Sequence, residues 1–390
     1  MTHQNGMLGD VKVLDFSQVI AGPFATMQMA LQGADVIKIE RPGSGDMMRD
    51  IMSKPPYSEH STSAGFLAFN SGKRSLSLDL KADDAKYILA PLIEWADVVV
   101  ESFRPGVMKS LGLDADTLMS TKPSLVYCSV SGYGQKGPKS RNPAFDGAIQ
   151  AESGMMSVTG WPDSDPLRAG FFAVDIPTGY AAAFAITSAL LKARATGNGV
   201  HIDLAMMDTA LTQMSMQIGE YYQTGTMPER LGNMSAARMA SDTTYRTLDG
   251  AIAVVALNTS QIAALHTVLR LHQPADAEAM AAVFALASSA DWAEKLHTVN
   301  VPCSIVRSLN KALEDEQLIH RSVLSHPPPP AGFGDTLLTV TGAPFVTNSA
   351  TPGPSSAPSL GEHSSEILLN LGFSKAEVSV WQDADVIQCS

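Results

Sequence analysis

The amino-acid sequence predicts an α/β protein built on a mostly parallel sheet that helices cover. Short apolar runs with strand character alternate with segments of helical spacing through the first half of the chain. This alternation is typical of parallel sheets, because neighbouring parallel strands are joined by crossover helices. The chain has 390 residues, 45% of them hydrophobic and 17% charged, so we expect two domains rather than one.

Each element of the first half is predicted by its own local pattern. Apolar runs predict strands at 11–16, 35–40, 75–80, 97–103, 124–132 and 199–205. Helical spacing predicts helices at 23–31, 83–96, 177–195 and 207–222. The first and third of these helices begin with a proline, a residue that the first turn of a helix tolerates.

The second half has a different pattern. Periodicity is lost from about residue 225 to 240, and residues 243–257 resemble a hairpin that enters a smaller domain of helices. Two proline-rich segments, 326–334 and 348–361, cannot form interior helix or strand and are expected to bridge domains. Helical spacing resumes at residue 363.

Composition excludes several classes of function. The formal charge of −12 argues against a general affinity for nucleic acid, so an anionic ligand must be held by local cations. The longest apolar run, 180–191, falls short of the about 20 residues that span a bilayer, and the amino terminus lacks a signal-peptide pattern. Three scattered cysteines, without zinc-ligand spacing, favour a reducing compartment. We therefore expect a cytoplasmic protein that does not bind membranes, nucleic acid or a structural metal.

The first strand and helix suggest a nucleotide site, but the motif is incomplete. The loop after the first strand ends in Ala21, Gly22 and Pro23 and lacks GxGxxG, and the chain also lacks the Walker, GxSxG and HExxH motifs. Arg41 follows the second predicted strand, where an arginine could pair with a phosphate or remain a solvated surface residue. Lys73 and Arg74, in NSGKRS, leave the same two alternatives open.

Two aspartates stand where helices are expected to begin. Asp175, in GFFAVDIPTGY, precedes the proline that opens the 177–195 helix, where free amide groups and the helix dipole stabilise an anion. Asp146, in PAFDGAIQ, precedes another stretch of small residues. Either carboxylate could be functional, and either could be an ordinary residue at a helix N-terminus.

Longer motifs identify the chain more specifically. They are VLDFSQVIAGPFATMQMALQGADVIKIERPGSGDMMR, FNSGKRSLSLDLK, ADVVVESFRPGVMKSLGL, SLVYCSVSGYGQKGP, PAFDGAIQAESGMMSVTG, VDIPTGYAAAFAITSALLKARATGNGVHIDLAMMD, VPCSIVRSLNKALEDEQL and APSLGEHSSEILLNLG. In this order they resemble the class III CoA-transferases, a family that includes formyl-CoA transferase, carnitine CoA-transferase and the 2-methylacyl-CoA racemases. The resemblance covers nearly the whole chain.

The resemblance implies a specific architecture. It implies a large Rossmann-like domain built from both ends of the chain, with a smaller α+β domain inserted after the midpoint. The corresponding boundaries here are 1–224 for the first part of the large domain, 225–325 for the inserted domain and 326–390 for the return to the large domain. It also implies two subunits interlocked as a homodimer.

The resemblance also assigns roles to single residues. Asp175 matches the catalytic nucleophile, and Asp146 matches an acidic position that faces the same site. The CoA-binding segments of the family correspond here to Ile20, Ala21, Arg41, Leu78, Lys81, Ser102, Phe103, Lys109 and Phe145.

Three positions depart from relatives within the family. Ile20 replaces a glutamine of formyl-CoA transferase, which argues against formyl-CoA and oxalate as substrates. Ser110 replaces an arginine that often binds CoA, and Lys109 stands beside it. Phe145 replaces the histidine of the racemases and cannot exchange a proton, so CoA transfer is favoured over racemisation. A racemase-like enzyme and a non-catalytic acyl-CoA binder remain the alternatives.

The reaction that the resemblance implies is covalent. Asp175 would form first a mixed anhydride with the acyl group and then a thioester with CoA. CoA is then substrate and product, and no tightly bound cofactor is expected. We expect succinyl-CoA or a similar donor and a small carboxylic acid, notably a dicarboxylic one, as acceptor. The cations available to pair with a second carboxylate are Lys136, Lys139, Arg141 and Arg168.

Overall fold

The computed structural model describes residues 6–329, 333, 338–348 and 353–390, and its chain divides into two compact units. The larger unit comprises Met1–Ser153, Gly170–Ser215 and Leu318–Ser390, and the smaller one comprises Gly154–Ala169 and Met216–Gln317. The sequence placed the first boundary at 225 instead. The structure groups residues 154–169 with the smaller unit because Gly232 N–H donates to the Gly160 carbonyl and the Arg230 guanidinium donates to the Trp161 carbonyl.

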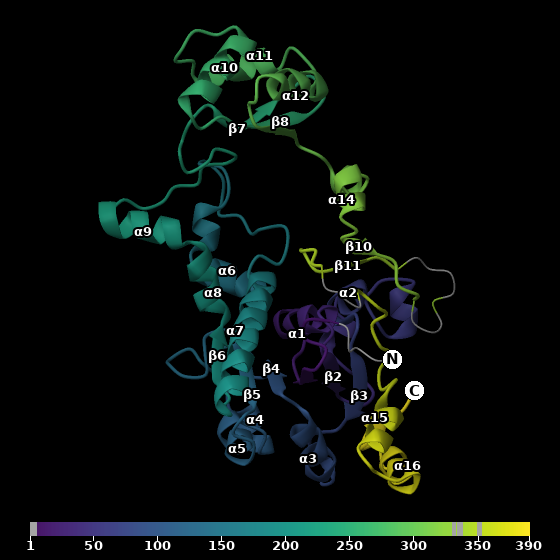
Figure 1. The fold of residues 1–390 in the computed structure, drawn as a ribbon. Coiled ribbons are helices and arrows are strands. Elements are labelled where there is room, and N and C mark those ends of the chain that lie inside the picture. The colour runs from purple at the N-terminus through teal and green to yellow at the C-terminus, as the bar shows by residue number, and fades with distance from the viewer. Residues whose placement is uncertain (1–5, 330–332, 334–337, 349–352) are drawn as a thin grey trace. The chain divides into compact units, whose positions relative to one another are not determined.

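A seven-stranded sheet forms the centre of the larger unit, in the order β12-β3-β2-β1-β4-β5-β6 (Figure 1). Its strands are β1 (Lys12–Asp15), β2 (Asp35–Glu40), β3 (Arg74–Leu78), β4 (Val98–Glu101), β5 (Val126–Ser131), β6 (His201–Ala205) and β12 (Ile387–Gln388). Every neighbouring pair is parallel except β12 and β3, which are antiparallel. The predicted α/β class with a mostly parallel sheet is therefore confirmed.

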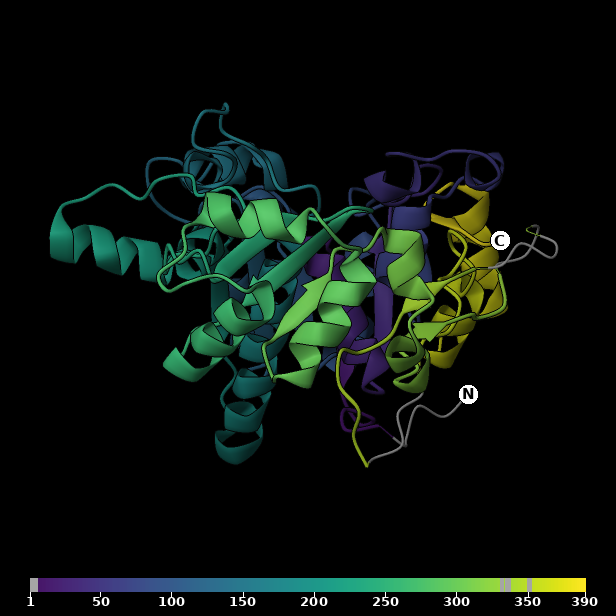
Figure 2. The same cartoon turned by 90° about the horizontal axis from the view of Figure 1, so that it is seen from above.

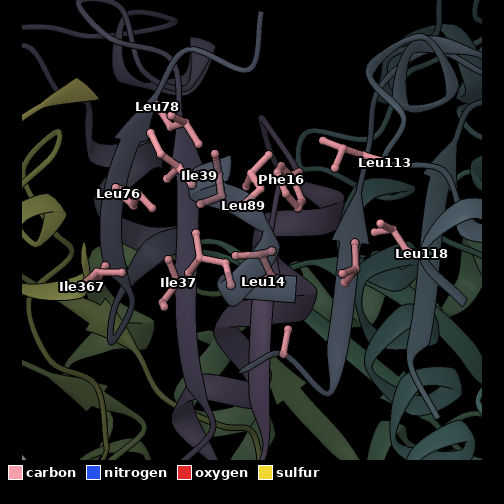
Figure 3. Close-up of a cluster of buried hydrophobic side chains, with 14 of the residues drawn as sticks. Leu14, Phe16, Ile37, Ile39, Leu76, Leu78, Leu89, Leu113, Leu118 and Ile367 are labelled. Atoms are coloured by element: carbon pink, nitrogen blue, oxygen red, sulfur yellow. The ribbon is translucent and has the colours of Figure 1, made fainter. Parts of the chain in front are cut away.

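Helices cover both faces of this sheet. On one face, Leu14, Ile37 and Leu76 from neighbouring strands belong to one buried apolar cluster (Figure 3). The helices that contribute to this cluster are α3 (Ala85–Trp95), α4 (Val107–Leu111), α5 (Ala115–Thr121), α15 (Ser364–Asn370) and α16 (Lys375–Asp383). Val13 and Val36 point to the opposite face, because side chains alternate along a strand. There they pack with α1 (Ala21–Leu31) and α7 (Asp175–Thr196).

The larger unit also contains shorter elements that the sequence pattern did not predict. They are η1 (Met47–Arg49), η2 (Tyr57–His60), α2 (Ala64–Asn70), and the antiparallel pair β10 (Leu324–Ser325) and β11 (Val340–Thr341). A helix start was expected at Asp146, and α6 (Asp146–Glu152) begins there. The helix predicted over 207–222 is interrupted at Met214, which separates α8 (Met206–Gln213) from α9 (Ser215–Thr224). Neither glycine nor proline marks this interruption, so the local sequence contains no signal for it.

The smaller unit has its own sheet and core. Its antiparallel sheet has the order β7-β8-β9, formed by β7 (Asp242–Arg246), β8 (Ala251–Val255) and β9 (Cys303–Ile305). The hairpin predicted over 243–257 is thereby confirmed. The unit's helical segments are η3 (Met155–Val158), α9 from Met216 onward, α10 (Thr259–Leu269), α11 (Ala277–Phe284), α12 (Ser289–Thr298) and α13 (Leu309–Leu313). The boundary with the larger unit falls within α14 (Glu316–His320), after Gln317. Figures 1 and 2 show α10, α11 and α12 in green beside the sheet, with which they share an apolar core.

The proline-rich segments are described only in part. Residues 330–332 and 334 of the first segment, and 349–352 of the second, lie outside the described residues. The helical spacing predicted from residue 363 is confirmed by α15 and α16. None of the helices in the described ranges combines the length and the apolar character that a membrane span requires.

Candidate active site

A cavity of about 460 Å³ opens in the larger unit at the carboxyl ends of β1, β4 and β5. Ligands of parallel α/β sheets bind at this edge, where loops leave the strands. The cavity is lined by Gln18, Val19, Ile20, Ala21, Gly22, Met47, Ser102, Phe103, Arg104, Pro105, Val130, Ser131, Gly132, Ser140, Asn142, Pro143, Ala144, Phe145, Asp175 and Met206. The first turns of α1 and α7 therefore meet the strand ends around one space.

Asp175 is the first residue of α7 and lines this cavity. Its side chain is only 8% exposed, so the carboxylate is largely shielded from water. The helix thus begins two residues before Pro177, where the sequence placed its start, and proline is tolerated in this first turn. The positive end of the helix dipole stabilises the anionic form of a carboxylate at this position.

Asp146 lies behind Asp175 rather than in the wall of the cavity. It is the first residue of α6 and is 2% exposed. Its Oδ2 accepts hydrogen bonds from the backbone N–H groups of Val174, at 2.8 Å, and Asp175, at 3.1 Å. Its Oδ1 accepts a hydrogen bond from Gln150 Nε2 at 2.5 Å. Asp146 therefore fixes the backbone at the start of α7, and the candidate nucleophile with it.

The structure brings together part of the CoA-binding set that the resemblance implied. The members that line the cavity with Asp175 are Ile20, Ala21, Ser102, Phe103 and Phe145. Two of the loops are joined directly, because the Ser102 hydroxyl accepts a hydrogen bond from the Gln18 N–H at 2.9 Å. The walls after β1 and β4 therefore form one connected surface.

The other predicted CoA-binding residues lie outside the cavity wall. Arg41, Lys81 and Lys109 are exposed to solvent, and the carbonyl of Arg41 accepts a hydrogen bond from the Gly45 N–H within a turn. Their CoA-binding role stays a prediction. Leu78 is 1% exposed and belongs to the core cluster of the sheet, so its side chain is committed to packing.

Among the described residues of the cavity wall, Arg104 is the one cation. The sequence analysis did not identify it. It follows β4 directly after Ser102 and Phe103, so the rule that ligands bind at strand ends could have identified it. Lys136 and Arg141, which the sequence suggested as partners of a carboxylate, are exposed and do not line the cavity. Lys139, also outside the cavity wall, forms an ion pair with Glu152. Arg168, the fourth of these cations, belongs to the smaller unit.

Buried ion pairs support the sheet beneath the cavity. The Lys73 side chain is fully buried, and its Nζ lies 2.9 Å from Asp15 Oδ2 and 2.8 Å from Asn70 Oδ1. Burial lowers the pKa of Lys73 to about 8 although Asp15 opposes this shift. Burial favours the neutral form of Asp15, but Lys73 and Lys38 outweigh it and hold the pKa of Asp15 below its usual range. Arg74, the other basic residue left open by the sequence, pairs with Asp35 at 2.7 Å.

Glu101, the last residue of β4, holds the segment of the cavity wall that follows this strand. Its Oε2 accepts a hydrogen bond from the Phe103 N–H at 2.9 Å, which ties the Ser102–Phe103 segment to the end of the strand. Burial raises the pKa of Glu101 to about 7, despite hydrogen bonds from Ser129 and Phe103 that favour its anion. The carboxyl group therefore changes charge near neutral pH, directly beneath residues that line the cavity.

Comparisons with known proteins agree with one another. A family described as CoA-transferase family III matches residues 8–364. Succinate–glutarate CoA-transferase of Agrobacterium fabrum is 36% identical over 71% of this chain and 70% of its own. Succinyl-CoA:mesaconate CoA-transferase of Haloarcula hispanica is 32% identical over 94% of this chain and 97% of its own. The crystal structure of a CaiB/BaiF family protein from Brucella suis, 28% identical, covers 94% of this chain and 100% of its own with a TM-score of 0.84.

Proposed function

Because this chain belongs to CoA-transferase family III, we propose that it moves CoA from succinyl-CoA to a second dicarboxylic acid through covalent intermediates on Asp175. The observation that carries this proposal is the position of Asp175. Its carboxylate is the first group of α7, is largely buried, and borders a cavity at the carboxyl edge of a parallel sheet. Such a place suits a nucleophile, because substrate can enter the cavity while bulk water is scarce.

The reaction proceeds in two symmetrical halves. The Asp175 carboxylate attacks the acyl carbonyl of the donor, its new C–O bond replaces the C–S bond, and CoA leaves as a thiolate. The thiolate then attacks the aspartyl carbonyl of the anhydride, which releases the donor acid as a carboxylate and leaves an aspartyl-CoA thioester. The acceptor carboxylate attacks this thioester and expels the thiolate, and the thiolate finally takes the acyl group from Asp175. No proton is gained or lost overall, and Asp175 ends as a free carboxylate.

Asp146 and Arg104 serve different parts of this reaction. Asp146 holds the Val174 and Asp175 amides in place, so the nucleophile needs little reorganisation before attack. Arg104 supplies positive charge in a cavity that must accept anions. A forked guanidinium suits the second carboxylate of a dicarboxylic acid, and the two curated relatives are named for succinate or succinyl-CoA together with glutarate or mesaconate.

The covalent step is tested by intact-protein mass spectrometry after incubation with succinyl-CoA alone. The wild-type protein is expected to gain the mass of CoA less one water, peptide mapping should locate this gain at Asp175, and Asp175→Asn is expected to gain none. Turnover with a second acid should fall by several orders of magnitude in the same variant. Asp208→Asn is the matched control, because Asp208 is an exposed carboxylate in the first turn of α8, outside the cavity wall.

The acceptor class is tested in a parallel screen. Succinyl-CoA is offered with dicarboxylic acids and with monocarboxylic acids of equal size, and new CoA esters are read by mass spectrometry. Faster turnover of dicarboxylic acids is expected, with the preference reduced in Arg104→Gln. Equal turnover of the two classes would remove the dicarboxylate assignment. Tight binding of CoA esters without any exchange would instead identify a non-catalytic binder.

A further inference from the structure

One residue of the cavity wall has an unfavourable backbone conformation. Val19 has φ of 70°, in the left-handed region. This region is uncommon for any residue except glycine, and a β-branched side chain makes it a true outlier. Strained backbone persists only where the surroundings hold it, and it gathers at ligand-binding sites. Val19 lines the same cavity as Asp175. The groups that keep Val19 in this conformation therefore also affect the shape of the candidate active site.

Two oppositely charged side chains hold the Val19 turn from its two sides. Asp46 Oδ1 accepts a hydrogen bond from the Val19 N–H at 3.0 Å. Lys38 Nζ donates a hydrogen bond to the Ser17 carbonyl at 2.7 Å. The two side chains also bind each other, with Lys38 Nζ 2.8 Å from Asp46 Oδ2. One ion pair therefore binds the backbone both at the strained residue and two residues before it.

This ion pair is fully withdrawn from water, since both side chains are 0% exposed. Burial opposes the charge of Lys38, but its pKa is nevertheless raised by the carboxylates of Asp46, Asp15 and Glu40. A buried ion pair contributes little to stability compared with apolar side chains of the same volume. A role in fixing a specific geometry explains its presence better than a role in holding the fold together.

We propose that Lys38 and Asp46 form a buried clamp that holds the Val19 turn and so fixes the cavity wall from Gln18 to Ala21. The residues on this wall act as positioning residues for the acyl-CoA ester. The wall leads directly into the first turn of α1, and the Ser102 hydroxyl binds it from the opposite loop through the Gln18 N–H. The proposal rests on the proposed function only in taking this cavity as the acyl-CoA site.

The strain itself is tested by two substitutions that remove the same side chain. Val19→Gly and Val19→Ala both delete the branched groups, but only alanine keeps the Cβ that conflicts with a positive φ. In ordinary backbone glycine is the less stable of the two because it loses more conformational freedom on folding. Here the order should reverse, with Val19→Gly melting a few degrees above Val19→Ala. The usual order would show that Val19 is not held under strain.

The clamp is tested in the steady-state kinetics of the same reaction. Asp46→Ala is expected to raise the KM for succinyl-CoA about tenfold with a smaller change in kcat, because the wall loses its fixed position. Asp46→Asn keeps an oxygen for the Val19 N–H and should restore part of the loss. Adding Val19→Gly to Asp46→Ala should also recover part of it, because glycine adopts the turn without being held.

Arg49→Gln is the matched control for loss of a buried ion pair, because glutamine carries no charge. Arg49 forms two hydrogen bonds of 2.8 Å with Glu40, is 3% exposed, and does not line the cavity. It should lower the melting temperature as Asp46→Ala does but leave the KM unchanged. The clamp would be overturned if the Arg49 control raised the KM as much as Asp46→Ala does. It would also be overturned if Val19→Gly combined with Asp46→Ala recovered none of the loss. If the wild-type protein binds CoA in calorimetry but transfers none, the proposed function fails, and CoA affinities in the same variants still decide the clamp.

Discussion

A carboxylate at the first residue of a helix is stabilised as an anion, and two such residues here have different tasks. Asp175 begins α7 and opens into the cavity, whereas Asp146 begins α6 and points to the backbone at the start of α7. The sequence could predict that both carboxylates stand near helix starts. It could not separate their tasks, because the bonds of Asp146 reach residues 28 and 29 positions away.

Asp146→Ala is expected to reduce both stability and kcat. It leaves the Val174 and Asp175 N–H groups without their acceptor, at a cost of about 1–3 kcal/mol for each buried donor. Asp146→Asn can still present one oxygen to these groups and should retain the fold, with a loss in kcat of about tenfold or less. Thermal unfolding and single-turnover kinetics with succinyl-CoA provide the two measurements.

The matched control removes a helix cap elsewhere in the same unit. The Asp114 side chain accepts hydrogen bonds from the Thr117 N–H and hydroxyl at the start of α5, outside the cavity wall. Asp114→Ala should lower stability, typically by about 1 kcal/mol for a lost cap, and leave kcat unchanged. An unchanged kcat in Asp146→Ala as well would mean that Asp146 only caps the helix.

For a charged residue within or next to a strand, the sequence did not predict whether the side chain is buried or which residue it pairs with. The apolar neighbours of Lys38 were enough to predict β2, and β2 is observed. Whether Lys38 pointed to solvent or to the interior depended on Asp46, which lies in a later loop. Lys73, directly before β3, was equally ambiguous, because its partner Asp15 is 58 positions away. Pairings of this kind follow from the assembled fold and leave no local pattern.

The distance between α1 and α7 determines how closely Asp175 approaches the part of the cavity wall that follows β1. Gly179, in the second turn of α7, makes the close contact between these helices possible. A Cβ built on it would lie 2.7 Å from Phe24 Cδ1 and 2.8 Å from the Ala21 carbonyl oxygen. The second of these atoms is backbone and belongs to a residue of the cavity wall, so the helices would have to separate.

Gly179→Ala is therefore expected to destabilise the protein and to lower kcat/KM for succinyl-CoA at least tenfold, although alanine favours helix by about 1 kcal/mol over glycine. Gly219→Ala is the matched helical control, because a Cβ on Gly219 in α9 meets no atom within 4 Å. It should be neutral or stabilising in thermal unfolding and should leave turnover unchanged. Similar behaviour of the two variants would show that the contact between α1 and α7 is not tight.

The strands were predictable because residues buried on both faces of a parallel sheet form continuous apolar runs. Thus β2 has the bounds expected from DVIKIE, and α3 lies within the predicted 83–96. Short helices such as α2 were missed, since seven residues show too little of the helical period to be recognised. The missed elements include η1, at the edge of the cavity, where Met47 forms part of the wall.

At the scale of the whole molecule, the exposed face of α7 supports the homodimer that the family resemblance implied. Tyr180, Phe184 and Leu191 lie on one side of this helix, at spacings of four and seven residues, and are 40%, 76% and 68% exposed. An apolar stripe of this kind is typical of a surface that binds another protein. We propose that a second copy of this chain covers it.

Light scattering is expected to report a homodimer for the wild-type protein rather than the 41.3 kDa of one chain. Phe184→Glu places a charge in the middle of the stripe and should shift the population to monomers, since a charge without a partner is costly to bury. Leu286→Glu, at a leucine of the smaller unit that is 77% exposed, is the control and should leave the dimer intact. A wild-type monomer at working concentration would contradict the proposal.

The hairpin of the smaller unit was expected from the sequence and is observed. The grouping of residues 154–169 with that unit was not foreseen. Their assignment depends on backbone bonds such as that between Gly160 and Gly232, which join distant parts of the chain regardless of side-chain pattern.

The antiparallel pairing of β12 with β3 bears on how the protein is made. Leu78 and Ser77 of β3 pair with Ile387 and Gln388, and the strand is interior to the sheet only because of this pairing. On the ribosome, β3 emerges long before β12, and the whole smaller unit is translated in between. An unpaired strand edge is a template for aggregation, and chains of this size rely on chaperones while such edges are open. The nascent protein therefore carries an open edge on β3 until the residues of β12 have been translated.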